Sequence, residues 1–439
     1  MKKILALTLV LLSYITLFSQ EGFQFTADAK KIKIPFQSSN NLMIIPVLVN
    51  DAKLNFLLDT GVEKTILFSL EDSDSLAFNN VEKIKIRGLG SGNAIDALHS
   101  KNNKIDINGY TDTNHEVYII LDQEINFSSQ LGIPVHGIIG YEFFKNHFVE
   151  INYIRKKIVV HKNSVSFSLK KLKRYEEIPI SIEIEKPYIQ AVTNLNSKEI
   201  KTKLLVDTGG SDALWLFENK KEIECPKNYF NDFLGRGFSG DIYGKRSRIE
   251  KFQIGKLGIS LPTISFPDTQ SLLSVTMVEG RNGSIGGEML KRFDVVFDYP
   301  NQKMYLKKNS NFNEPFNYNM SGIEIQHNGL QWIKETIELK TRFVNTKISV
   351  IDDTEKSIKY NFMLKPVYEV TSVRENSPGA IAGIQKGDII SKINGHSVFN
   401  IKLHEITDLL QSEEGKTIIL EVERNGKTLK FKFQLKKIL

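Results

Sequence analysis

Cysteine is almost absent from this chain. Cys225 is the single cysteine in 439 residues, so the chain cannot form an intramolecular disulfide. It stands in EIECPKNY with no motif around it, and we interpret it as a structural thiol, not as a nucleophile. With 41% hydrophobic and 25% charged residues, the composition is that of a globular protein stabilised by packing.

Several common hydrolase motifs are also missing. The sequence has no HExxH, no Gly-x-Ser-x-Gly and no P-loop, and its eight histidines are dispersed. We therefore expect no metal and no other cofactor. Lys and Arg total 58 against 51 for Asp and Glu, but the lysines are scattered, which favours a solvated surface over a nucleic-acid partner.

Long apolar runs are rare as well. One follows Lys2 and Lys3 and extends over residues 4–18, ending just before Ser19 and Gln20. A charged start and a short apolar run are typical of a secretory signal peptide, and the run is shorter than the ~20 residues that a membrane-spanning helix needs. We predict a signal peptide at residues 1–20, no transmembrane domain in the mature chain, and a periplasmic, cell-envelope or secreted location.

Strand-like segments make up most of the remaining sequence. Segments such as LMIIPVLVN, KLNFLLD and EVYIILD are short, rich in β-branched or aromatic residues, and bounded by Asn, Asp or Gly. Long amphipathic helical patterns are missing. The chain is therefore predicted to be mainly β, and at ~100–200 residues per domain its length allows two to four domains.

A long internal repeat divides the chain. GIIGYEFFKNHFVEINYIRKKIVVHKN begins at Gly137, and GSIGGEMLKRFDVVFDYPNQKMYLKKN aligns with it without a gap, beginning at Gly283. Upstream of each copy, LLDTG ends at Gly61 and LLVDTG ends at Gly209, with a Gly-rich segment in between. Three features recurring in one order predict a duplicated lobe, one copy at residues 21–170 and the other at residues 171–312.

Each lobe contributes one carboxylate at the same place in the repeat. Asp59 and Asp207 are the two catalytic candidates, because two carboxyls that share one proton can activate a water as base and acid. Two like charges in one small site cannot both stay ionised, the situation for which the aspartic-protease dyad is the general example. Hydroxyl groups and small residues beside the carboxylates would brace the two loops; these supporting candidates are Thr60, Gly61, Thr208 and Gly209.

These residues carry a family resemblance over about the first three quarters of the mature chain. LLDTG and LLVDTG after apolar strands, with Ile138-Ile139-Gly140 and Ser284-Ile285-Gly286 downstream, resemble the aspartic peptidases of the retropepsin and pepsin type. The resemblance implies two β-barrel-like lobes, interlocking threonines, and aspartic endopeptidase activity on a peptide or protein substrate. The chain departs from the pattern at Val62 and Gly210, which follow the two triplets, and at Ser284.

The resemblance also implies Gly-rich flaps that close over an extended peptide. In both lobes the Gly-rich segment lies between the aspartate loop and the hydrophobic-Gly step, which is residues 138–140 in the first lobe and residues 284–286 in the second. Ordinary turns are an alternative interpretation of these segments. A flap in each lobe is more similar to a fused retropepsin dimer than to pepsin. The flap candidates are Gly88, Gly90, Gly92, Gly237 and Gly240.

The last part of the chain resembles a PDZ domain of the bacterial type. After connecting strands predicted at residues 313–357, the segment YEVTSVRENSPGAIAGIQKGDIISKINGHSV carries the resemblance, and the domain is assigned to residues 358–439, with β-strands and short helices. The implied groove would bind an extended peptide by strand addition. The peptide-binding candidates are Tyr360, Asn361, Phe362, Tyr368 and Val370.

Two alternatives stay open at this point. The PDZ domain could act as a structural cap instead of a peptide-binding unit. The whole chain could also be a catalytically inactive envelope scaffold that binds peptides, in place of an aspartic endopeptidase.

Overall fold

The structure is a computed structural model of the chain. It describes residues 22–26, 28–68, 76–86, 95–120, 127–162, 167, 169–219, 221–237, 240–273, 277–338 and 358–439. The predicted signal peptide at residues 1–20 and the flap candidates Gly88, Gly90 and Gly92 lie outside these residues. Among the residues that the structure describes, no helix is long and apolar enough to cross a lipid bilayer.

The first lobe is built on a nine-stranded sheet in the order β1-β9-β6-β10-β5-β4-β8-β7, with β3 paired to β4. Asn50 and Asp51 join β4 to β5 with positive φ angles of 46° and 70°, the conformation that a two-residue hairpin turn requires. The elements of this lobe are β1 (Gln24–Phe25), β3 (Gln37–Ser39), β4 (Leu42–Val49), β5 (Ala52–Leu58), β6 (Thr65–Leu67), β7 (Glu82–Ile86), β8 (Ile95–Ile107), β9 (Tyr110–Ile120), α2 (Phe127–Leu131), β10 (Gly137–Ile139) and α3 (Tyr141–Phe144).

The second lobe repeats this plan in a ten-stranded sheet, in the order β18-β19-β22-β17-β23-β16-β15-β20-β21, with β14 paired to β15. Asn196 and Ser197 make the turn equivalent to Asn50 and Asp51, with φ angles of 51° and 63°. Its elements are β14 (Ser181–Glu183), β15 (Lys186–Leu195), β16 (Lys198–Val206), β17 (Leu214–Leu216), β18 (Tyr229–Gly237), β19 (Gly240–Arg248), β20 (Lys251–Ile254), β21 (Leu257–Ser260), β22 (Thr263–Pro267), α5 (Thr269–Leu272), β23 (Arg281–Ile285) and α6 (Gly287–Leu290).

A third sheet joins the two lobes beneath the site, in the order β13-β25-β24-β11-β12-β2. Its central pair is β11 of one copy against β24 of the other, and Glu150 faces Val296, its own counterpart in the repeat. A local twofold axis therefore runs between the copies. The elements here are β2 (Lys31–Pro35), β11 (Phe148–Asn152), β12 (Lys157–His161), α4 (Leu169–Leu172), β13 (Glu176–Pro179), β24 (Phe293–Asp298), η1 (Tyr299–Asn301), β25 (Lys303–Lys308) and η2 (Ser310–Asn313).

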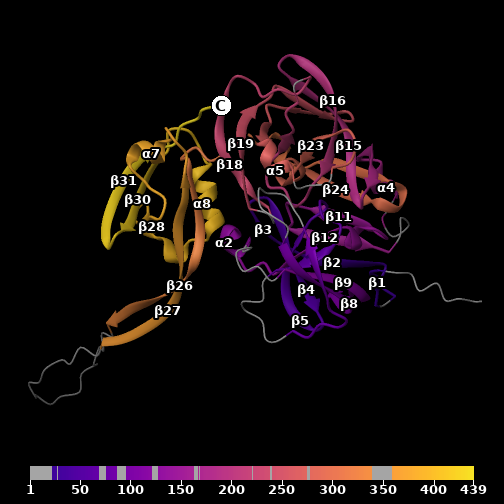
Figure 1. Cartoon of the computed structure of the whole chain (residues 1–439), viewed down its shortest axis with the longest axis horizontal. Helices are drawn as coiled ribbons and strands as arrows, with labels where there is room; N and C mark the ends of the chain where they lie inside the picture. The colour runs from indigo at the N-terminus through magenta and orange to yellow at the C-terminus, as the bar shows by residue number, and fades with distance from the viewer. Residues whose placement is uncertain are drawn as a thin grey trace, which may run out of the picture.

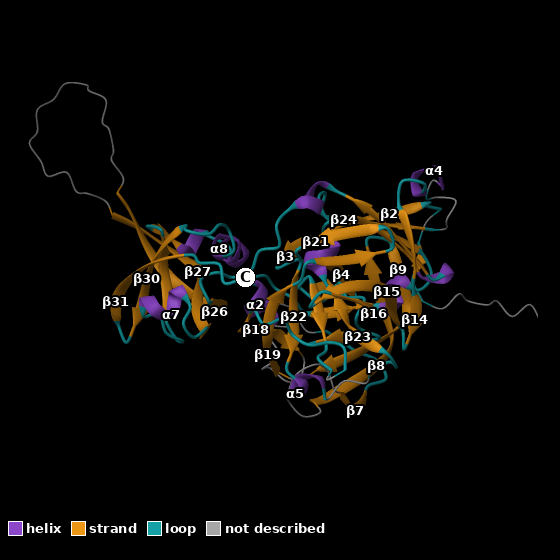
Figure 2. Cartoon of the chain, turned by 90° about the horizontal axis from the view of Figure 1, so that it is seen from above, coloured by secondary structure: helices purple, strands orange, loops and turns teal. Residues whose placement is uncertain are grey.

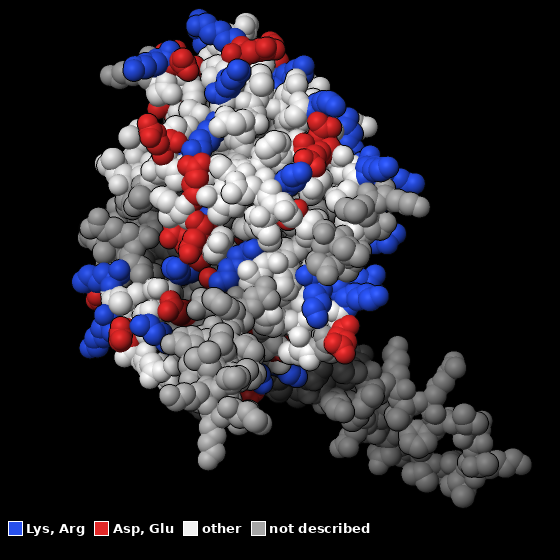
Figure 3. Space-filling view, turned by 90° about the vertical axis from the view of Figure 1, so that its right-hand side faces the viewer, with Lys and Arg blue, Asp and Glu red and all other residues white. Residues whose placement is uncertain are grey.

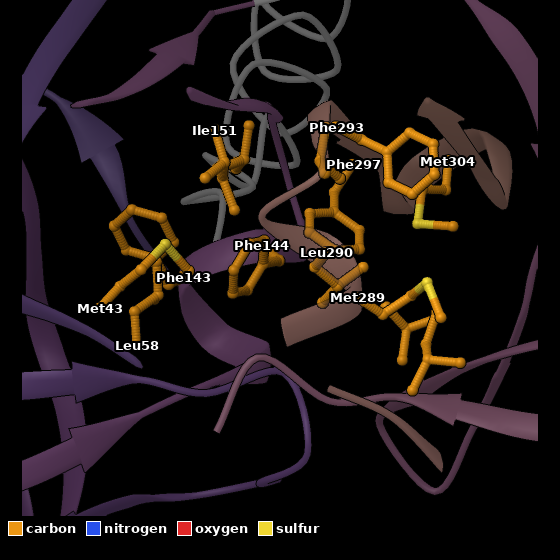
Figure 4. Close-up of a cluster of buried hydrophobic side chains, with 14 of the residues drawn as sticks. Met43, Leu58, Phe143, Phe144, Ile151, Met289, Leu290, Phe293, Phe297 and Met304 are labelled. Atoms are coloured by element: carbon orange, nitrogen blue, oxygen red, sulfur yellow. The ribbon is translucent and has the colours of Figure 1, made fainter. Parts of the chain in front are cut away.

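The two short helices after the hydrophobic-Gly steps meet in one core. Phe143 and Phe144 of α3 and Met289 and Leu290 of α6 are all buried in the same hydrophobic cluster, and they occupy equivalent positions in the repeat. Figure 4 shows Phe144 between Phe143 on one side and the side chains of α6 and β24 on the other. This continuous core holds the two aspartate loops at a fixed distance from each other.

The C-terminal unit has a separate core and a sheet in the order β26-β27-β28-β30-β31, with β29 paired to β28. Its long hairpin of β26 and β27 extends away from the lobes (Figure 1). The elements are β26 (Ile323–Glu338), β27 (Ile358–Val373), α7 (Pro378–Ala382), β28 (Ile389–Ile393), β29 (His396–Ser397), η3 (Val398–Asn400), α8 (Leu403–Leu410), β30 (Thr417–Arg424) and β31 (Lys427–Gln434).

The expected division between connecting strands at 313–357 and a domain at 358–439 is therefore corrected. β26 starts at Ile323 and is the edge strand of the C-terminal sheet, so it belongs to that unit and not to a linker. The boundary between the lobes at residue 170 stays a prediction. The mainly β fold class, with few and short helices, is confirmed.

Views from two directions place the C-terminal unit beside the lobes, with α8 turned toward them (Figures 1 and 2). On the face of the molecule shown in Figure 3, basic and acidic side chains are interspersed.

Candidate active site

The two aspartates end two equivalent strands. Asp59 follows β5 and Asp207 follows β16, and each strand runs parallel to the strand that carries the hydrophobic-Gly step, β10 or β23. The backbone N–H of Asp59 donates to Ile139 O, and that of Asp207 donates to Ile285 O, both at 2.9 Å. The repeat thus delivers both carboxylates to the same point between the lobes.

Thr60 and Thr208 interlock behind the aspartates. Each backbone N–H donates to the other threonine's Oγ1 at 3.0 Å. The Thr60 hydroxyl donates to Val206 O at 2.6 Å, and the Thr208 hydroxyl donates to Leu58 O at 2.9 Å. Because both threonines are fully buried, these four hydrogen bonds fix one aspartate loop against the other.

Gly61 and Gly209 lie directly against the carboxylates. Their backbone N–H groups donate to Asp59 Oδ1 at 2.6 Å and to Asp207 Oδ1 at 3.0 Å, each within its own loop. A Cβ on Gly209 would come within 2.2 Å of the Asp59 carboxyl carbon, and one on Gly61 within 3.0 Å of Oδ1 of either aspartate. Only glycine therefore leaves room for the two carboxyl groups, which share a hydrogen bond.

The two carboxyls differ in their electrostatic surroundings. Burial and the neighbouring charge of Asp207 raise the pKa of Asp59 well above its usual range. Burial also raises the pKa of Asp207, but the Arg281 guanidinium and the N–H groups of Gly209 and Gly210 oppose that rise. The arrangement favours a single proton shared by the two carboxyls.

The dyad opens into a large cleft of about 1390 Å³, lined by both lobes and by the C-terminal unit. On the second lobe, β18 and β19 form a hairpin over it, and Gly237 faces Gly240 at its last described pair. Gly240 has a φ of +117°, a conformation that favours glycine. On the first lobe, β7 and β8 form the equivalent hairpin, and its flap candidates lie outside the described residues.

The three departures from the family pattern have different surroundings. Val62 O accepts the N–H of Tyr141, and Gly210 O accepts the N–H of Gly287, so both residues hold the hydrophobic-Gly step in place by backbone hydrogen bonds, and the Val62 side chain also packs on the hydrophobic cluster of the first lobe. Ser284 lines the cleft near Asp207. None of the three displaces an aspartate or a threonine of the site.

A buried ionic network, which the sequence did not reveal, lies behind the second aspartate loop. Asp212 accepts hydrogen bonds from Trp215 Nε1 and Ser265 Oγ, both at 2.8 Å, and pairs with Arg246 Nη1 at 2.8 Å. Arg246 Nε in turn pairs with Asp232 at 2.7 Å. No sequence motif marks this set, because its members come from four separate strands and a loop.

The network continues into the C-terminal unit. Arg374 pairs with Asp232 at 3.0 Å, and its guanidinium lies over the Phe230 ring at 4.2 Å. Glu324 on β26 is partly buried beside these charges. The contact fixes the C-terminal unit on the β18–β19 hairpin of the second lobe.

The peptide-binding candidates of the C-terminal unit are not where the sequence analysis expected them. Tyr360, Asn361 and Phe362 are part of β27 and pair with β26 along the extended hairpin, not in a carboxylate loop. Tyr368 and Val370 are buried in the core of the unit, 3% and 0% exposed, so they cannot line a groove. The residues of this unit that line the cleft are on β26, the edge strand, on α8, and on β27 at Glu369, Thr371 and Ser372, with Lys386 after α7.

The loop in front of β26 leads into the edge strand of the C-terminal sheet. Asn319 Oδ1 accepts the backbone N–H groups of Ser321 and Gly322 at 3.1 and 3.2 Å, and Met320 N–H donates to Leu410 O of α8 at 3.1 Å. Gly322 adopts φ +73° at this turn.

Family models match one segment of the first lobe and one segment of the C-terminal unit. Residues 45–143 match the family model described as aspartyl protease, and residues 369–424 match the one described as PDZ domain. A solved aspartic proteinase from Irpex lacteus is similar with a TM-score of 0.41 at 12% identity, covering 65% of this chain and 99% of that chain.

Two curated proteins named probable CtpA-like serine protease match shorter stretches. The protein of Staphylococcus haemolyticus is 33% identical over 69 residues, 16% of this chain and 14% of that protein. The protein of Staphylococcus saprophyticus is 34% identical over 58 residues, 13% of this chain and 12% of that protein. The chain thus spans only a small part of the length of the curated relatives it matches.

Proposed function

We propose that this protein, which joins an aspartyl protease domain to a PDZ domain, is an aspartic endopeptidase whose catalytic residues are Asp59 and Asp207. The observation that carries the proposal is the pair of carboxyls held together by the interlocked Thr60 and Thr208. Both carboxyls face a cleft large enough for an extended peptide.

The proposal divides the two roles by the surroundings of the carboxyls, because the charge of Arg281 favours the ionised form of Asp207. Asp207, ionised, takes a proton from a water as the water oxygen attacks the scissile carbonyl carbon, and Asp59 gives its proton to the carbonyl oxygen. The tetrahedral diol then collapses. Asp207 passes its proton to the leaving amine nitrogen, the C–N bond breaks, and one hydroxyl of the diol returns a proton to Asp59.

The PDZ domain is proposed to hold a peptide beside this cleft. Its edge strand β26 and helix α8 line the same cleft as the dyad, so one extended chain could contact both. The N–H groups of Ser321 and Gly322 already bond to Asn319, which favours recognition of an internal segment over capture of a terminal carboxylate.

Export through a cleaved signal peptide is also part of the proposal. It rests on the basic start and the apolar run at residues 4–18. N-terminal sequencing of the protein purified from an expressing cell should begin near residue 21, and a chain that retains residues 1–20 would count against cleavage.

The test of catalysis compares the wild type with Asp59→Asn and Asp207→Asn on a peptide library, with cleavage products identified by mass spectrometry. Each substitution is expected to lower kcat by at least about 10³-fold, because the two carboxyls act as a unit. Both variants are expected to keep the wild-type Tm to within a few degrees, since an amide replaces a carboxyl of the same shape.

Wild-type turnover in Asp59→Asn would overturn this mechanism. Absence of cleavage in every sample, with peptide binding retained, would favour the catalytically inactive peptide-binding scaffold instead.

A further inference from the structure

The internal repeat allows the walls of the cleft on the two sides of the dyad to be compared residue by residue. Phe68 N–H donates to His136 O at 2.8 Å in the first lobe, and Phe217 N–H donates to Asn282 O at 2.8 Å in the second. The residue before each acceptor is Val135 in one lobe and Arg281 in the other. These two therefore occupy equivalent positions.

The wall in the first lobe is apolar. Val135 is fully buried in a hydrophobic cluster with Phe68, Leu131 and Ile138, and the Phe127 ring packs on Phe68 at 5.1 Å. Ile138 and Phe127 reach the surface of the cleft itself. This side suits a hydrophobic substrate side chain.

The equivalent wall in the second lobe is polar, not apolar, at two positions. Arg281 replaces the valine, and Ser284 replaces the isoleucine, and both line the cleft on the side of Asp207. The Arg281 guanidinium lies over the Phe217 ring at 5.3 Å. Phe217 is the equivalent of Phe68, so this position contacts an aromatic ring in the first lobe and a cation in the second.

The charge of Arg281 is only partly satisfied. Its Nε donates to Gly283 O at 3.2 Å, and among the described residues no carboxylate forms a salt bridge with its guanidinium. Burial lowers the pKa of Arg281, against the opposing attraction of Tyr188 and Asp207. The other basic residue beside the dyad, Lys186, is by contrast paired with Glu63 at 2.9 Å.

We infer that the cleft selects peptides with an acidic side chain next to the scissile bond on the side of the second lobe, and an apolar side chain on the side of the first. The inference rests on the proposed peptidase function. A Glu or Asp carboxylate would supply the partner that the Arg281 guanidinium lacks, in the two-pronged geometry that arginine favours, and the Ser284 hydroxyl could donate a further hydrogen bond.

The experiment uses the full chain and four peptides of one length that differ only at the two residues flanking the scissile bond, Leu-Glu, Leu-Gln, Glu-Leu and Gln-Leu. At about pH 6, where glutamate is ionised, the wild type should prefer Glu to Gln at one of the two positions by about 10-fold or more in kcat/KM. Arg281→Leu should reduce that ratio to about 1.

A matched control removes a different cation from the cleft. Arg236 lies on the β18–β19 hairpin and has a carboxylate partner, Asp241, at 3.6 Å. Arg236→Leu should keep the Glu-over-Gln ratio of the wild type.

Binding of the same peptides to Asp59→Asn, measured by calorimetry, separates this inference from the proposed catalysis. A Glu-over-Gln preference that disappears when Arg281→Leu is added supports the inference even if no peptide is cleaved. Equal binding and cleavage of Glu and Gln peptides by the wild type would overturn it, as would a preference that survives Arg281→Leu.

Discussion

At the level of single residues, Thr60 and Thr208 make the contacts that set the distance between the catalytic loops. Thr60→Val should lower the free energy of unfolding by about 1–3 kcal/mol, because the N–H of Thr208 and the carbonyl of Val206 lose a buried partner. Turnover should fall with it. Thermal unfolding and kcat measured together test this.

Thr60→Ser is the matched control, since it keeps the hydroxyl and removes only a methyl group. It should keep most of the stability and most of the turnover. Equal losses in the serine and valine variants would mean that packing of the methyl group, and not the hydrogen bonds, holds the loops.

The dependence of activity on pH follows from the charge beside Asp207. In the proposed mechanism Asp207 acts ionised and Asp59 protonated, so the acid limb of the pH-rate profile should report mainly Asp207. Arg281 opposes the rise in the pKa of Asp207, and Arg281→Leu should therefore move the acid limb to higher pH. A limb that does not move in a profile of kcat against pH would show that Arg281 does not act on the dyad.

The sequence could predict the dyad but not the residues that distinguish its two sides. Asp59, Asp207 and the two threonines were readable because identical tripeptides recur in an aligned repeat. Arg281 could not be predicted as a site residue, because a single arginine at the start of a strand indicates no function by itself. Its position becomes informative only once its counterpart, Val135, is known to be buried. Ser284 was noticed as a departure, but only its place in the cleft gives it a role.

At the level of elements, the contact between β26 and the β18–β19 hairpin contains a carboxyl that should respond to pH. Burial and the charge of Asp232 raise the pKa of Glu324 to about 8, against the opposing effects of Arg246 and Arg374. The folded chain thus holds a proton that the unfolded chain releases, and stability should fall as pH rises from about 4.5 to about 8.

Glu324→Gln should remove that dependence, because the amide carries no titrating proton. The Tm of the wild type should fall relative to Glu324→Gln between about pH 5 and pH 9, in thermal scans of the two proteins. Glu423→Gln, at an exposed position of β30, is the control and should follow the wild type. Parallel curves for the wild type and Glu324→Gln would contradict the assignment.

The sequence was less informative about the elements of the PDZ domain than about those of the lobes. β26 was taken for a connecting strand because its partner in the sheet lies across an intervening segment. Tyr368 and Val370 were taken for groove residues, since alternation along β27 does not reveal that another strand covers its edge.

At the level of the whole molecule, α2 of the first lobe packs against β26, and Gly132, just after α2, lies against Leu403 at the start of α8. The PDZ domain is therefore attached to both lobes. On the other side, Arg374 anchors it through Asp232 of the second lobe.

Arg374→Ala should loosen this attachment, because Asp232 loses one of its two cations and Phe230 loses the guanidinium that covers it. The radius of gyration in small-angle X-ray scattering should increase, while the far-UV circular dichroism of the two folded parts stays the same. Arg155→Ala, at an exposed position of the first lobe, should leave the radius of gyration unchanged. An unchanged radius in Arg374→Ala would mean that α2 alone is sufficient to hold the domain.

The sheet that joins the lobes also bears on how the protein matures. β11 needs β24 as its neighbour, and Asp59 needs the loop of Asp207, yet these partners are separated by more than a hundred residues of sequence. A nascent chain that has emerged only through the first lobe holds a single carboxylate without its partner and half of the shared sheet. Contacts so distant in sequence form late. If the proposed hydrolysis is right, it therefore has to wait until the second lobe has been synthesised and folded, and the growing chain cannot cleave neighbouring proteins before then.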